Sequence, residues 1–270
     1  SYPMPNIEEK LNKLHGSKFF SSVDCLSGYW QIKLTPRARR ITAFICSKGL
    51  YEYKTMPFGL CNAGSTFQRV MERMLDGLPN STAYIDDLFT HSKTFDEHVE
   101  HLEELFKRVK NAKLKLKTTK CELGGSETMF LGFKVGEHGI KIDDQRIKSM
   151  INYPKPTNLK KLRTFLGMAS YYRKFIKDFS TLTEPLNKLL KKNTKFIWSE
   201  DCDDTFKVII KMLTTSPILA YPNFDQKFHV TTDASDYGIG AVLSQFDENN
   251  VERPIYYASR TLNKAERNYS

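Results

Sequence analysis

The chain has 270 residues, of which 40% are hydrophobic and 27% are charged, and its formal net charge at pH 7 is +10. This balance is ordinary for a globular protein of one to three domains and argues against a disordered or fibrous chain. No apolar run approaches the roughly 18 residues that a membrane-spanning helix needs, so we expect no membrane partner.

The first third of the chain predicts one short helix, several strands and one long helix. Asn6 and Glu9 are spaced as a capping box, which predicts a helix over 6–14. Strand-like runs follow at 19–24, 29–34, 41–46 and 51–54. Residues 62–78 carry an apolar stripe with helical spacing, so this helix must pack on a sheet.

The middle of the chain predicts a hairpin, a helix and more strands. Thr94 and Glu97 form a second capping-box spacing at the start of a helix over 94–110. Strands are predicted at 114–117, 128–134 and 139–142. A sheet with helices on one face makes this part of the chain α+β.

The last part of the chain predicts helices and then strands. Helical segments are expected from Asp143 to Pro154, from a cap at Thr157 onward, over 182–191, and from the acidic turn after Trp198. From Ile218 onward the pattern favours strands, with Asp233 at the end of one.

Asp86 and Asp87 are adjacent acids at the tip of the predicted hairpin, between β-branched and aromatic flanks. Asp24 ends another predicted strand. Asp is also favoured in turns for local reasons, so a solvated turn is the alternative reading. Carboxylates held rigidly together would suit hard divalent cations, and without such cations they would repel one another.

The cysteines and histidines show no zinc pattern. The five cysteines include no Cys-x-x-Cys pair, so we expect reduced thiols in an intracellular compartment. His98 and His101 lie three residues apart among glutamates. A solvated acidic helix face explains them better than a metal site does.

Positive charge is concentrated in two stretches. Residues 107–120 hold seven basic side chains and no acidic one, while residues 146–195 hold 13 basic and 2 acidic side chains among many aromatic ones. Basic side chains follow phosphates, although a solvated helix surface over an aromatic core gives the same pattern. We expect both, with rings inward and most charges facing a nucleic-acid duplex.

An ordered set of short motifs extends over almost the whole chain. They include Tyr2–Pro5, Phe20–Tyr29, Thr42–Phe44, Met56–Leu60, Asn62–Gln68, Tyr84–Asp87, Lys120–Glu122, Phe130–Gly132, Leu162–Gly167, Tyr171–Arg173, Thr232–Ser235, Gly240–Gln245 and Ala265–Ser270. In this order the motifs resemble the reverse transcriptase region of the Pol polyprotein of a Ty3/gypsy-type long-terminal-repeat retrotransposon.

The resemblance implies an α+β reverse transcriptase organisation. Partial fingers and a palm, an antiparallel sheet with packed helices, are expected over 1–142, and a helical thumb over 143–197. A connection and the N-terminal part of a ribonuclease H-like α/β sheet are expected over 198–270. The remaining fingers would lie upstream of Ser1, and the remaining ribonuclease H acids would lie beyond Ser270.

The resemblance also implies site residues. Asp24, Asp86 and Asp87 match the catalytic acids that bind two Mg²⁺ ions, for which Mn²⁺ is the alternative. Tyr29 matches the aromatic residue that lies under the incoming sugar and excludes a 2′-hydroxyl, and Phe58 lies beside the nucleotide.

Three further matches lie later in the chain, and one residue departs from the family pattern. Phe130, Leu131 and Gly132 match the segment that grips the primer. Asp233 matches the first acid of a ribonuclease H site that is incomplete here. Gly64 stands where the family usually has proline, which predicts slightly lower local stability at the start of the helix.

The expected function is an RNA-directed DNA polymerase core that uses an RNA or DNA template with primer and deoxynucleoside triphosphates. The alternative is a catalytically inactive, nucleic-acid-binding remnant of a retrotransposon, whereas a ribonuclease acting alone lacks its partner acids. The resemblance implies the rest of the Pol polyprotein as a partner. It also implies a cytoplasmic location in a virus-like particle, with the nucleus as the alternative.

Overall fold

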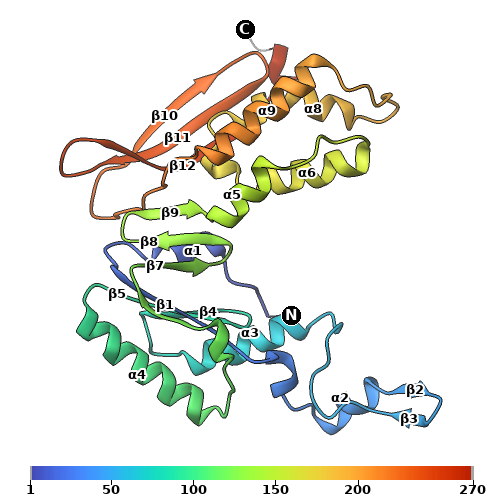
Figure 1. The fold of residues 1–270 in the computed structure, drawn as a ribbon, viewed down its shortest axis with the longest axis vertical. Helices are drawn as coiled ribbons and strands as arrows, with labels where there is room; N and C mark the ends of the chain where they lie inside the picture. Colours follow the sequence, from blue (N-terminus) through green and yellow to red (C-terminus); the bar gives the residue numbers. More distant parts are fainter. Residues whose placement is uncertain (1, 269–270) are drawn as a thin grey trace. The chain divides into compact units, whose positions relative to one another are not determined.

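The computed structural model describes residues 2–268, which divide into two compact units (Figure 1). The first unit runs to Leu131 and includes Val135–Glu137, and the second contains Gly132–Lys134 and the chain from His138 on. Ser1 and the last two residues of the Ala265–Ser270 motif lie outside the described residues. The division of the chain into three segments stays a prediction.

A four-stranded antiparallel sheet is the centre of the first unit, with the strand order β4-β5-β1-β6. Its strands are β1 (Phe19–Asp24), β4 (Ser81–Tyr84), β5 (Asp87–Ser92) and β6 (Glu122–Gly125). Strands β4 and β5 form the predicted hairpin. The strand predicted at 19–24 is also confirmed.

Helices α3 (Ala63–Met74) and α4 (Phe95–Asn111) pack against this sheet (Figure 1). One buried cluster joins Val23 and Leu88 of the strands to Phe67 of α3 and Leu105 of α4. The capping box at the start of α4 is confirmed in both of its hydrogen bonds. Burial of these apolar side chains is the main favourable term that holds the unit together.

Two strand predictions in the first unit are wrong, and a third is only partly confirmed. Residues 28–31 form the 3₁₀ helix η1 (Gly28–Gln31), because Ser27 has a left-handed backbone and starts a tight turn. The run at 41–46 is confirmed only over β2 (Phe44–Cys46), because its first residue ends α2 (Pro36–Ile41), a helix capped by Thr35. The run at 114–117 makes one isolated bridge, between Leu116 and Cys25, before η2 (Thr118–Lys120).

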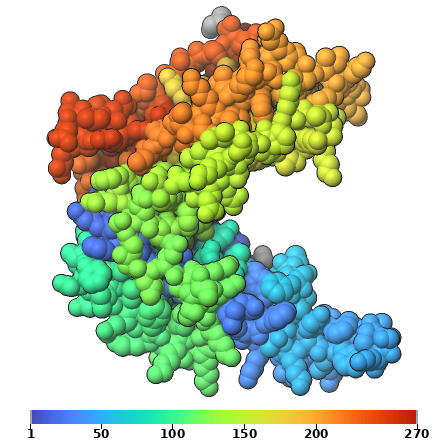
Figure 2. All heavy atoms as spheres, viewed as in Figure 1, coloured from blue at the N-terminus to red at the C-terminus, as the bar shows by residue number. Residues whose placement is uncertain are grey.

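The first unit also contains α1 (Ile7–Asn12) and a small hairpin of β2 (Phe44–Cys46) and β3 (Gly49–Tyr51). In the space-filling view, α2 and this hairpin form a projection from the first unit (Figure 2). The strand predicted at 128–134 is two strands, β7 (Glu127–Phe130) and β8 (Phe133–Gly136), because a turn separates them. The division between the units falls within β8.

After Gly132–Lys134, the second unit contains β9 (Gly139–Ile142), then helices and then a sheet. The helices are α5 (Asp144–Ile151), α6 (Leu159–Tyr171), η3 (Arg173–Phe175), α7 (Phe179–Leu182), α8 (Glu184–Leu189) and α9 (Glu200–Thr214). Asn158, and not Thr157, caps α6, because its side chain accepts a hydrogen bond from Lys161 N. None of the described helices has the length and apolar character needed to cross a membrane.

An antiparallel meander of three strands follows, and α7 lies against two of them. Its strands are β10 (His229–Ala234), β11 (Gly238–Phe246) and β12 (Glu252–Thr261), followed by η4 (Glu266–Asn268). Among the aromatic residues of the basic region, Phe165 and Tyr172 are buried, whereas Tyr171 is exposed. Lys174 is an exception to the expected outward charges, since it is buried with its ammonium 4.0 Å from the ring centroid of Phe133.

Candidate active site

The three candidate catalytic acids lie at one end of the four-stranded sheet. Asp24 ends β1 and Asp87 begins β5, and the two residues are directly opposite in the antiparallel register. Asp86 lies in the two-residue turn between β4 and β5, and its carbonyl accepts a hydrogen bond of 3.0 Å from Cys25 N. The fold therefore makes neighbours of acids that are more than sixty residues apart in sequence.

A buried glutamine holds the turn that carries Asp86. Ile85 has a φ of 55°, which is unfavourable for a β-branched residue. Its N–H donates a hydrogen bond of 2.6 Å to Oε1 of Gln68, and Nε2 of Gln68 donates to the carbonyl of Ala83 at 3.0 Å. Because Gln68 is completely buried in α3, the helix fixes the position of the turn.

Negative charge is crowded at this end of the sheet. Burial raises the pKa of Asp87, and the charges of Asp86 and Asp24 raise it further. Burial and the same acids raise the pKa of the Cys25 thiol to about 12, so the thiol is neutral at pH 7. The ammonium of Lys120 lies 3.2 Å from Oδ2 of Asp24 and supplies a local positive charge.

The donor set suits a hard divalent cation, because carboxylate oxygens are the preferred ligands of such ions. A cation would also relieve the repulsion that raises the pKa of Asp87. Within residues 2–268, no three His, Cys, Asp or Glu side chains are placed so that they could together hold a metal ion. The three acids therefore supply the ligand type that such ions prefer and share one end of the sheet, but their side chains are not arranged as a ready-made metal site in this structure.

Tyr29 lies in η1 within a small group of aromatic rings. Its ring centroid is 5.4 Å from that of Phe58 and 5.7 Å from that of Phe67. Tyr29 is half-buried, whereas Phe58 is largely exposed, so both rings are accessible. A Cβ added to the neighbouring Gly28 would lie 2.7 Å from Cζ of Phe67, so only glycine fits at this position without movement of the ring.

The predicted primer-grip residues form the turn after β7. Phe130 is buried, and its ring stacks on that of Phe89 with centroids 4.1 Å apart. Leu131 and Gly132 both have positive φ values, 53° and 79°, as two-residue hairpin turns of one common type require. The turn geometry is thus fixed by the backbone and by the buried ring of Phe130.

Asp233 lies in the second unit, on the exposed strand β10 opposite Gly240. It lines a pocket of about 110 Å³ together with Asp178. A Cβ on Gly240 would lie 1.9 Å from Oδ1 of Asp178, so glycine lets this carboxylate approach the strand. Asp233 thus has a second acid in its pocket that the sequence did not indicate.

Several residues around the first site were not identified from sequence. Gln68 belonged to a matched motif and Lys120 to a basic stretch, but no local pattern indicated that they contact the catalytic turn and Asp24. The prediction of a solvated face at His98 is wrong, because this residue is buried and its Nε2 lies 2.7 Å from Oγ of Ser21. The available signal in the sequence was the helical spacing that places His98 on the same face of α4 as Leu105 and Val109, which are buried.

Comparison with known families identifies the chain. The family described as "Reverse transcriptase (RNA-dependent DNA polymerase)" matches residues 1–135, and the "RNase H-like domain found in reverse transcriptase" matches residues 198–270. The chain belongs to the reverse transcriptase family.

Two relatives are polyproteins of transposons. The chain is 40% identical over 272 residues to the retrovirus-related Pol polyprotein from transposon 297 of Drosophila melanogaster, and 37% identical over 271 residues to the transposon Tf2-3 polyprotein of Schizosaccharomyces pombe. Both alignments cover 100% of this chain, which spans 25% and 20% of the two relatives. The resemblance to Ty3/gypsy-type Pol polyproteins is confirmed.

The fold is that of solved foamy viral reverse transcriptases. The foamy viral protease-reverse transcriptase dRH in complex with double-stranded DNA matches with a TM-score of 0.89 and 24% identity, over 99% of this chain and 47% of that one. The same type of protein in complex with an RNA/DNA hybrid matches with a TM-score of 0.88 and 24% identity, over 100% and 37%. The α+β prediction is therefore confirmed.

Proposed function

We propose that this chain is the core of an RNA-directed DNA polymerase that copies a template into DNA. The observation that carries the proposal is the register pair of Asp24 and Asp87, with Asp86 in the adjoining turn. Three carboxylates at one end of a rigid sheet suit a nucleotidyl transfer assisted by two metal ions. The sequence relationship to Pol polyproteins supports the same assignment.

Asp24, Asp86 and Asp87 would hold two Mg²⁺ ions, or Mn²⁺ in their place. When bound, the ions would stabilise the charge that develops on the attacking and leaving oxygens. Tyr29 would exclude a ribose 2′-hydroxyl by steric clash, with Phe58 beside the nucleotide.

The turn at 130–132 would position the primer end, and the two basic stretches would contact the duplex through its phosphates. The partners would be template with primer, deoxynucleoside triphosphates and the remainder of a Pol polyprotein. The solved complexes of the foamy viral proteins with double-stranded DNA and with an RNA/DNA hybrid support a duplex partner. We further propose that the protein works in the cytoplasm within a virus-like particle.

Primer extension on an RNA template tests the proposal. Asp86→Asn should lower magnesium-dependent extension by roughly a thousandfold or more, because metal assistance is worth several kcal/mol. Duplex binding, measured by fluorescence anisotropy, should stay within about twofold, since phosphate contacts carry most of it. Asp76→Asn, an exposed acid after α3, is the matched control and should extend normally.

The assay also separates the two candidate functions. Duplex binding without extension, by the wild-type chain and by a longer polyprotein chain alike, would favour an inactive nucleic-acid-binding remnant. The ion pair between Lys120 and Asp24 is the feature that fits this alternative. Equal extension by Asp86→Asn and the wild type would refute the assignment of the acids.

A further inference from the structure

The first unit contains a pocket of its own, at the opposite end of the β1–β5 ladder from the three acids. The ladder runs from the Asp24–Asp87 pair to the Phe19–Ser92 pair, and Ser92 lines the pocket. The pocket has a volume of about 320 Å³, within the range of ordinary small-ligand sites. None of the three candidate acids lines this pocket, so the proposed polymerase chemistry does not account for it.

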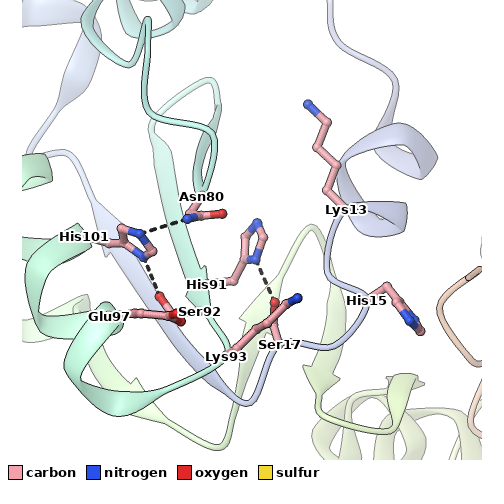
Figure 3. A pocket seen from close by; sticks show the side chains of 9 residues that line it. All are labelled: Lys13, His15, Ser17, Asn80, His91, Ser92, Lys93, Glu97 and His101. Carbon is pink, nitrogen blue, oxygen red and sulfur yellow. Dashed lines mark hydrogen bonds between the residues drawn. The ribbon is translucent and has the colours of Figure 1, made fainter.

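The floor of the pocket contains a neutral histidine with one ring nitrogen available. His91 is buried, and its Nδ1 lies 2.8 Å from Oγ of Ser17 (Figure 3). Burial, together with the smaller effects of nearby His101 and His98, lowers the pKa of His91 to about 4. In the described chain no buried side-chain nitrogen or oxygen lacks a hydrogen-bond partner, so Nε2 of His91, which makes no hydrogen bond, is reached by solvent.

The wall beside His91 is already ordered by hydrogen bonds. Nδ1 of His101 lies 2.7 Å from Oγ of Ser92, and its Nε2 lies 2.9 Å from Nδ2 of Asn80 (Figure 3). The carbonyl of Asn80 also accepts a hydrogen bond of 3.0 Å from the backbone N–H of His91. A ligand would therefore meet a preorganised surface, which lowers the entropic cost of binding.

The rim of the pocket is positively charged. Lys13 and Lys93 line it, and neither makes an ion pair with any described residue. Glu97 is the single acid among the described lining residues, and one of its oxygens accepts a hydrogen bond from the N–H of Thr94 in the capping box of α4. Two unpaired lysines at the rim of a neutral, hydrogen-bonding floor favour an anionic ligand. The side chain of Lys13 points away from His91 in Figure 3, so it would turn toward the ring when the ligand binds.

We propose that this pocket binds a phosphate group, held by the ammonium groups of Lys13 and Lys93 and by the Nε2–H of His91. The hydroxyl of Ser17 would donate to Nδ1 of His91 and so place the ring proton on Nε2, facing the ligand. A dianionic tetrahedral phosphate can neutralise both lysines and accept all of these donors, whereas a carboxylate carries one charge. The proposal is independent of the polymerase function.

Titration of the 270-residue chain with inorganic phosphate, followed by NMR of the histidine ring nitrogens, tests the proposal. Binding should be saturable and should shift Nε2 of His91. The double variant Lys13→Met/Lys93→Met should bind at least about tenfold more weakly, because two charge-assisted contacts are lost. Lys48→Met, which removes an exposed lysine from the β2–β3 turn, is the control and should bind as the wild type does.

A competition experiment distinguishes a free phosphate ion from the terminal phosphate of a nucleic acid. Displacement of inorganic phosphate by a 5′-phosphorylated dinucleotide, but not by its 5′-hydroxyl form, would assign the site to terminal phosphates. Displacement by neither would assign it to the free ion. Equal phosphate affinity in the double variant and the wild type, or no saturable binding to the wild type, would overturn the proposal. The lysines are exposed, and a thermal melt confirms that the variants fold.

Discussion

At the scale of single residues, the position of the turn that contains Asp86 depends on Gln68. This side chain satisfies the N–H of Ile85 and the carbonyl of Ala83 from within the core. A buried polar group whose partner is removed costs about 1–3 kcal/mol. Because the left-handed backbone of Ile85 is itself unfavourable, loss of its hydrogen bond should also let the turn move.

Gln68→Met is expected to lower the free energy of unfolding by about 1–3 kcal/mol and to lower primer extension more than duplex binding. Methionine keeps the length of the side chain but removes both hydrogen bonds to the turn and a third, of 2.8 Å, to Oε1 of Glu72. Urea unfolding and the extension assay measure the two effects. Gln145→Met, at an exposed position of α5, is the control. Unchanged stability and activity in Gln68→Met would show that the turn holds its position without this side chain.

The residues that sequence could place were those with local signals. Asp86 and Asp87 lay at a recognisable hairpin tip, and Asp24 ended a recognisable strand, so their common end of the sheet could be predicted. The contacts of Gln68 and Lys120 with this site cross 17 and 96 residues of sequence. Such contacts depend on how helices and loops pack, and a single sequence does not record them.

At the scale of elements, helix ends were predicted best where a side chain caps them. Thr94 and Glu97 form the capping box, and the first turn of α9 carries its predicted acids. Strand predictions failed where short apolar runs were taken to be extended. Thr35 followed by Pro36 was an unused helix-start signal before α2. The run after Gly28 became a 3₁₀ turn, because its aromatic ring packs on Phe67 and not on a neighbouring strand.

Thr94→Ala is expected to lower the free energy of unfolding by about 1 kcal/mol, because the first turn of α4 loses its cap. Amide hydrogen exchange should show faster exchange in the first turn of α4 and little change at its end. Thr119→Ala, at an exposed position in η2, is the control for loss of a threonine. Equal exchange in the first turn of both variants would contradict the assignment of the cap.

At the scale of the whole molecule, the order of the motifs predicted the family and the fold class, and both predictions are confirmed. Composition alone allowed only a globular protein with a basic surface. The division into three segments stays a prediction, and the first boundary between the two compact units lies inside the hairpin of β7 and β8. The turn at residues 131 and 132 indicates a hairpin, but no local sequence pattern indicates that the hydrophobic core is divided between two units at this point.

Stability of the molecule should depend on pH through His91. Its folded-state pKa is about 4, below the value of 6.5 for a free histidine, so the unfolded chain binds the proton first as pH falls. The contribution of His91 is therefore complete above pH 6.5 and is lost toward its folded-state pKa. The loss should be about 2 kcal/mol between about pH 7.5 and about pH 5.

Unfolding experiments in phosphate-free buffers check this expectation. His91→Gln should reduce the slope of stability against pH, although the lowered pKa of His98 leaves part of it. The exposed His138→Gln should keep the full slope. The raised pKa of Asp87 acts in the opposite direction, since its contribution is lost as pH rises through its folded-state value. A slope unchanged by His91→Gln would refute the role of this residue.

The bare α-carbon of Gly28 has a consequence for how the aromatic group can vary. The ring of Phe67 reaches into the volume that a methyl group at residue 28 would fill, and Tyr29 rests edge-on against that same ring. The absence of a side chain at residue 28 therefore leaves room for the ring on which Tyr29 packs. Any larger residue at position 28 would displace the ring of Phe67 and, through it, the ring of Tyr29.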